Sequence, residues 1–144
     1  MPSSSSPALG ASGEYDWGRF GLGLSVLGTG ASSDLGTATL FAIAALASFE
    51  AFEVTETTSF RVQSELGVAI ATGDPAADAK GRTATAVHAS FAAGLQQLAH
   101  IDGGVDLAWI IGGGFASSLN AEADGQRLVG LGGGFVMIGG GIRF

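Results

Sequence analysis

Apolar side chains recur at every second position over most of this chain, and this alternation limits its fold more than any other feature. Within residues 59–71 one set of alternate positions is Phe60, Val62, Leu66, Val68 and Ile70, and the other is Arg61, Gln63, Glu65, Gly67 and Ala69. A period of two is typical of a β-strand with two unlike faces, because successive side chains point to opposite sides. Similar alternation returns in segments that begin near Phe20, Thr83, Val105 and Leu128. The sequence therefore predicts an all-β fold.

Turn-forming residues divide these stretches at regular intervals. Segments 28–36, 73–81 and 117–125 combine Gly with Asp, Ser, Asn or Pro, which favour turns. Two segments with a weaker turn signal, near 48–55 and 97–103, lie between them. Longer and shorter connections therefore alternate, as in consecutive hairpins. This arrangement predicts six antiparallel, up-and-down strands. Residues 37–52 suit either a strand or a helix, because they hold several alanines and apolar residues of both parities; the hairpin spacing favours a strand.

The face opposite the apolar residues indicates which side of the sheet is enclosed. It consists mainly of Gly, Ala, Ser and Gln, and charged residues make up only 13% of the chain, against about 25% in a typical soluble domain. Small residues suit the crowded inside of a narrow barrel, whereas a soluble sheet would carry more charge on its wet face. We therefore expect the apolar face to point outward into lipid. Because lipid cannot satisfy unpaired backbone groups, the expected fold is a closed transmembrane β-barrel.

The last ten residues, FVMIGGGIRF, carry a more specific signal. Val136, Ile138, Ile142 and Phe144 occupy alternate positions, with Gly140 interrupting the series. This ending resembles the C-terminal strand of the outer-membrane β-barrel proteins of Gram-negative bacteria. The resemblance implies a place in the outer membrane, contact with membrane lipid, and recognition of these four apolar residues by the barrel-assembly machinery.

The strand count departs from that family. Single-chain barrels begin at about eight strands, and the alternation accounts for six. The chain could lack an N-terminal hairpin and export signal, several chains could share a barrel as a homo-oligomer, or strands could have been merged. We expect the first, a C-terminal part of a small barrel protein. Residues 1–16 are expected to form a flexible polar tail, and residues 17–144 the barrel domain.

A few polar side chains fall on the face expected to line the barrel: Arg19, Arg61, Glu65, His88, Gln96, Asp106 and Arg143. Narrow barrels are filled by side chains, and charges inside them persist when they are partnered. We therefore expect these residues to pair into a polar cluster in the lumen. The alternative is that they line a narrow pore and set its ion selectivity.

Other function classes find little support in the sequence. The six basic residues are scattered and the net charge is −7, so nucleic-acid binding is not expected. Neither G-x-S-x-G, H-E-x-x-H nor G-x-x-x-x-G-K-[ST] occurs, and there is no cysteine. We expect no enzymatic activity, cofactor or metal, and a structural, adhesive or narrow-pore role in the outer membrane. The alternative is a soluble secreted β-sandwich or lipocalin-like barrel that binds a small apolar ligand between inward apolar faces.

Overall fold

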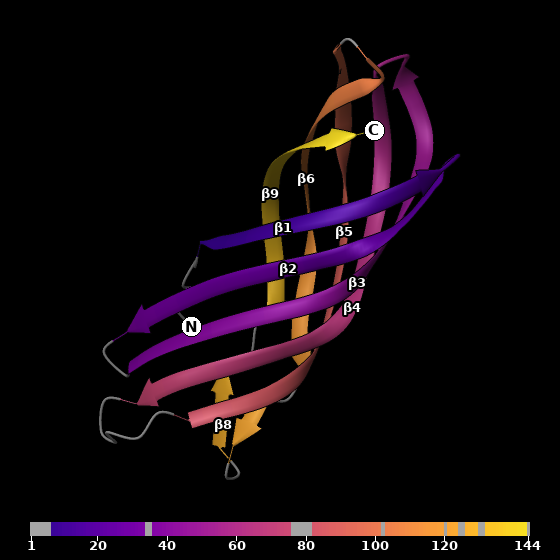
Figure 1. Cartoon of the computed structure of the whole chain (residues 1–144). Helices are drawn as coiled ribbons and strands as arrows, with labels where there is room; N and C mark the ends of the chain where they lie inside the picture. The colour runs from indigo at the N-terminus through magenta and orange to yellow at the C-terminus, as the bar shows by residue number, and fades with distance from the viewer. Residues whose placement is uncertain are drawn as a thin grey trace.

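The computed structural model describes residues 7–33, 36–75, 82–101, 103–119, 121–123, 126–129 and 132–143. Seven strands form one antiparallel sheet in which neighbours in space are neighbours in sequence (Figure 1). They are β1 (Ala8–Trp17), β2 (Phe20–Ser33), β3 (Gly36–Thr55), β4 (Thr58–Pro75), β5 (Arg82–Ile101), β6 (Val105–Leu119) and β9 (Gly132–Arg143). Strands β7 (Ala121–Ala123) and β8 (Gln126–Val129) pair only with each other. The described residues include no helix able to cross a membrane.

The sheet curls into a half-barrel. In Figure 1, β1 to β4 cross the front of the molecule while β5, β6 and β9 run behind them. Within the described residues β1 pairs only with β2, and β9 pairs only with β6, so these two strands are the edges of the sheet. The predicted all-β, antiparallel, up-and-down fold is confirmed. The described strands leave the barrel open, where the sequence predicted a closed one.

The strand count and several boundaries differ from the prediction. Strand β1 occupies residues that were expected to belong to a flexible tail. Leu128, expected to begin the last strand, lies in β8, and the last strand begins at Gly132. The predicted turn segments were also too long, since β2 continues to Ser33 and β3 runs on to Thr55. Pairing with neighbouring strands fixes these residues as strand, although Gly and Ser have little preference for it.

Residues 37–52 lie within β3, which confirms the strand reading. Apolar residues occupy both odd and even positions in this segment, and packing explains why. Leu40 and Leu46 point to the inner side and are buried, whereas Phe41 and Ile43 point outward and are about half exposed. This strand therefore places apolar side chains on both faces.

The two faces of the sheet differ sharply in residue size and exposure. On β4 the outward Leu66 is 64% exposed, whereas the inward Ala69 is 0% exposed. Outward residues of β3, β5 and β6 are likewise exposed, among them Ile43, Val87 and Ile111. The predicted orientation, with the large apolar residues on the outside and the small residues enclosed, is confirmed.

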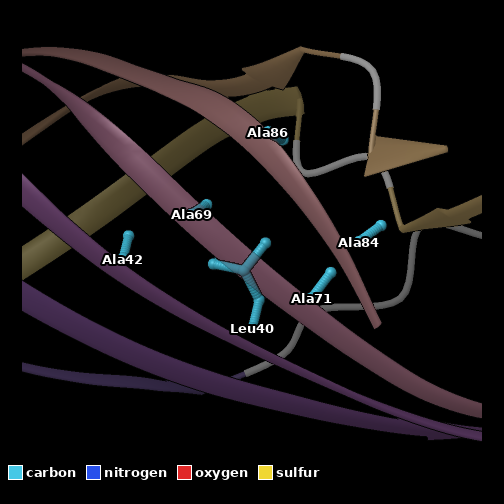
Figure 2. Packing of buried hydrophobic residues seen from close by; sticks show 6 residues of the cluster. All are labelled: Leu40, Ala42, Ala69, Ala71, Ala84 and Ala86. Atoms are coloured by element: carbon cyan, nitrogen blue, oxygen red, sulfur yellow. The ribbon is translucent and has the colours of Figure 1, made fainter. Parts of the chain in front are cut away.

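The buried apolar core lies on the inner side of β3, β4 and β5. It consists of Leu40, Ala42, Ala69, Ala71, Ala84 and Ala86 (Figure 2). The β7–β8 hairpin contacts the same three strands. Among the described residues this cluster is one leucine and five alanines, so it buries less apolar area per residue than a core of large aliphatic side chains.

Glycine allows the inner side to pack this closely. A Cβ atom on Gly67 of β4 would collide with the carbonyl oxygen of Ile43 and the Cα atom of Ala44, and would lie 2.7 Å from the Cβ atom of Ala44. These obstacles belong to the β3 backbone or its first side-chain atom, so rotation of a side chain cannot remove them. Glycine at such positions permits a tightly bent sheet.

Candidate functional site

The main polar feature of the inner face is centred on Arg61 of β4, which is only 6% exposed. Its Nη2 atom lies 2.9 Å from Glu14 Oε1 and 2.9 Å from Asp16 Oδ1. The same nitrogen donates a hydrogen bond of 2.7 Å to Ser48 Oγ. Its Nη1 atom donates to Gln96 Oε1 at 3.0 Å. We call these five residues the Arg61 cluster.

The curl of the sheet brings the members of this cluster together. Glu14 and Asp16 lie on the edge strand β1, which is separated from β4 by β2 and β3. In a flat sheet two intervening strands would place them about 14 Å from β4. Curling brings β1 across the inner side, where the long arginine side chain reaches both carboxylates. Arg61 therefore links β1, β3, β4 and β5.

Gly21 of β2 makes room for this contact. A Cβ atom there would collide with Asp16 Oδ1, and would lie 2.6 Å from Ser48 Oγ and 2.8 Å from the Glu14 carboxyl carbon. The glycine thus leaves the space above the β2 backbone to polar groups of β1 and β3. The cluster holds one guanidinium and two carboxyl groups, and it is stabilised by charge-assisted hydrogen bonds from the arginine.

A second polar group lies nearby on β4 and β5. Ser90 Oγ donates a hydrogen bond of 2.7 Å to Glu65 Oε2. The Nε2 atom of His88, a residue that is almost fully buried, lies 3.9 Å from the same oxygen. A serine nucleophile is normally bonded to a histidine base, whereas this hydroxyl donates to a carboxylate. The arrangement has the character of buried polar pairing.

The remaining residues of the predicted lumen cluster lie apart from these two groups. Asp106 Oδ1 lies 2.8 Å from Nδ1 of His100, whose side chain is 73% exposed. Arg19 is exposed in the β1–β2 turn, apart from the Arg61 cluster. The prediction assumed that Arg19 belongs to a strand, in which alternate side chains share a face, but the residue lies in a turn. Arg143 pairs with Asp106 through backbone register, and its side chain lies outside the described residues.

The predicted assembly signal lies along one edge. Val136, Ile138 and Ile142 point outward from β9 and are exposed. Phe144 lies outside the described residues. The three described members therefore share one face, as their alternation predicts.

Sequence reasoning placed Arg61 and its partner Gln96 on the inner face but missed the other partners of Arg61. Glu14 and Asp16 were assigned to the tail, and Ser48 to a break. A usable signal was present in GEYDWG, residues 13–18, where two acids alternate with two aromatic residues as in a strand with unlike faces.

Among the described residues no three His, Asp or Glu side chains are grouped so as to hold a metal ion. No protein-family model, curated protein or solved structure matches this chain.

Proposed function

We propose that this chain is a non-catalytic β-barrel protein of the outer membrane of Gram-negative bacteria, with a structural, adhesive or narrow-pore role. The observation that carries the proposal is that the described part of the outer face holds no charged side chain. None of the Asp, Glu, Lys or Arg side chains described within the strands shares the parity of the exposed apolar residues. A soluble sheet with this outer face would expose large apolar side chains on several adjacent strands, which soluble monomers rarely do.

The height of the apolar face fits a bilayer. On β4 the outward apolar residues extend from Phe60 to Ile70. These ten residue steps correspond to about 33 Å along the strand at about 3.3 Å per residue. With a strand tilt of about 40°, the band is about 25 Å tall, as in outer-membrane barrels.

Aromatic pairs gather at one end of this band. The rings of Phe20 and Phe49 lie 4.9 Å apart between centroids, and those of Phe52 and Phe60 lie 5.1 Å apart. Tyr15 and Trp17, 6.2 Å apart, continue the series on β1. All six residues lie near the β1–β2 or β3–β4 turn. Aromatic girdles mark the membrane interface in barrels of this type.

The Arg61 cluster favours a structural interior. Arg61 bonds to charged and neutral polar groups of three other strands, which fits the polar plug that the sequence predicted. The alternative of a soluble ligand-binding barrel requires apolar side chains on the inside. The described inner face holds mainly alanine, glycine and polar residues, with Leu40 and Leu46 as its large buried apolar side chains, so it favours the membrane barrel over that alternative.

The two tryptophans provide a direct test. Trp17 and Trp109 point outward and are 48% and 53% exposed. In vesicles of lipids brominated on the acyl chains, we expect strong quenching of Trp109 fluorescence and weaker quenching of Trp17, which lies beside the turn. The variants Trp17→Phe and Trp109→Phe isolate each signal, and vesicles without bromine are the control. A folded chain that stays in the aqueous phase, with unquenched fluorescence, contradicts the proposal.

A further inference from the structure

The β7–β8 hairpin lies between β6 and β9 in the sequence, and its backbone contacts three adjacent strands of the main sheet, β5, β4 and β3. Neighbouring strands of one sheet stand about 4.8 Å apart, so a hairpin that continued the sheet sideways beyond β5 would not also reach β3. The hairpin therefore crosses over one face of the sheet. It lies at the end opposite the short turns at Gly18 and Gly103, which we call the far end (Figure 1).

Burial identifies the face that the hairpin covers. On β3 the outward Phe41 is 46% exposed, whereas Leu40 beside it is buried. On β4 the outward Ile70 is 47% exposed, whereas the inward Ala71 is buried completely. Neighbouring alanines alone cannot bury a methyl group, because a buried side chain touches about 6–12 other residues. A second layer must lie above this wall, so the hairpin sits on the inner side of the curled sheet.

The hairpin is only loosely attached to that wall. Among the described residues β7 and β8 pair only with each other, and their short pairing has a register shift between Ala121 and Glu122. The wall beneath consists of one leucine and five alanines, which offer little apolar area to hold a second layer. The hairpin can therefore leave without breaking any described strand pair of the main sheet.

The other half of the interior is fastened more firmly. There Arg61 joins β1, β3, β4 and β5 through ion pairs and hydrogen bonds. These bonds belong to strands of the main sheet, so opening this half requires the sheet itself to uncurl. Elements with few buried contacts open locally at a lower free energy than the rest of a fold. The hairpin is therefore the part of the interior that opens first.

We propose that the β7–β8 hairpin is a displaceable plug, which fills the interior at the far end and opens it by leaving while the seven-stranded sheet stays intact. Because the Arg61 cluster occupies the other half, displacement opens an uncharged recess from one end and not a continuous channel. For a chain in the membrane this inference rests on the proposed barrel. Displacement of the hairpin itself requires only the folded sheet.

Cysteine labelling tests the plug in the intact chain, which has no cysteine of its own. The variants Ala84→Cys and Ala71→Cys place a thiol at paired positions of the covered wall. Ala92→Cys is the matched control, since Ala92 is equally buried on β5 but lies outside this wall, opposite Gly114 of β6. Thr57→Cys, in an exposed turn, gives the rate of a free thiol. Each variant, folded in detergent micelles, reacts with a water-soluble maleimide at urea concentrations below the unfolding transition.

We expect Ala84→Cys and Ala71→Cys to react at least about tenfold faster than Ala92→Cys, and at least about tenfold more slowly than Thr57→Cys. Their rates should hardly change with urea, because local opening exposes little surface, whereas the rate of Ala92→Cys should rise steeply. Replacing residues 121–129 by a short Gly-Ser linker should bring Ala84→Cys close to the rate of Thr57→Cys and leave Ala92→Cys unchanged.

Three results would overturn the inference. Equal rates and equal urea dependence for Ala84→Cys and Ala92→Cys would mean that the hairpin opens only with the whole sheet. A rate of Ala84→Cys equal to that of Thr57→Cys in the intact chain would mean that the wall is not covered. Rapid labelling of Ala92→Cys in the linker variant would mean that the sheet does not survive without the hairpin. Labelling needs no lipid, and quenching by brominated lipids tests the membrane location separately, so the two proposals can fail independently.

Discussion

Arg61 Nη2 lies 2.9 Å from Asp16 Oδ1, and this contact joins a central strand to an edge strand of the same sheet. No backbone hydrogen bond links β1 to β4, because β2 and β3 lie between them. The side-chain contact therefore fixes the curl of the sheet directly. Loss of the contact should affect the whole half-barrel more than the pairing of any two neighbouring strands.

The first prediction concerns Arg61→Gln. This change removes Arg61 from beside the Glu14 and Asp16 side chains, which are 20% and 15% exposed. Breaking a buried ion pair from one side costs about 3–5 kcal/mol; we expect the lower end, because both carboxylates keep some exposure. Urea unfolding in detergent micelles measures the loss.

Arg19→Gln is the matched control for Arg61→Gln, because Arg19 is exposed in a turn. We expect a change within about 0.5 kcal/mol. The triple variant Glu14→Gln, Asp16→Asn, Arg61→Gln should recover part of the stability lost on Arg61→Gln. Equal unfolding midpoints for Arg61→Gln and Arg19→Gln would show that the contact does not hold the sheet.

The second prediction concerns Gly67→Val. The added side chain would collide with the β3 backbone at Ile43 and Ala44, so β3 and β4 must separate. We expect a loss of about 3 kcal/mol, at the upper end for overpacking. Gly13→Val is the control, since nothing lies within 4 Å of a Cβ atom at Gly13. The same unfolding assay compares them, and a tolerated Gly67→Val would contradict the close approach of the two strands.

The third prediction separates lipid from water as the medium around the outer face. Leu66→Arg places a charge in the middle of the apolar band on β4. We expect it to reduce the free energy of folding into vesicles by about 2–4 kcal/mol. Thr57→Arg, in the exposed β3–β4 turn, should have little effect. If Leu66→Arg folds into vesicles as readily as Thr57→Arg, the outer face does not contact acyl chains.

The fourth prediction concerns the stacked rings of Phe52 and Phe60, which are inclined by 10°. A double-mutant cycle with Phe52→Leu and Phe60→Leu should give a coupling free energy of about 0.5–1.5 kcal/mol. A cycle that pairs Phe52→Leu with Phe115→Leu is the control, because Phe115 lies on β6, which is not adjacent to β3. A coupling near zero in the first cycle would argue against the stacked geometry.

The sequence alone determined the fold class and the orientation of the faces. Alternation from Phe60 to Ile70 predicts a strand, and the glycine, alanine and serine opposite it predict an enclosed side, because these properties depend on neighbouring residues in the chain. The location of β1 could also have been predicted from Glu14, Tyr15, Asp16 and Trp17. That signal was outweighed by the polar residues that precede it.

Only the tertiary structure decided which polar groups meet and whether the sheet closes. Arg61 lies 45 residues from Asp16 and 35 from Gln96, and no local pattern relates such positions. Their contact depends on the curvature that accumulates over four strands and on the absence of side chains at Gly21 and Gly67. The edges at β1 and β9 have the same origin, since the number of paired strands is a property of the whole sheet and not of any one segment.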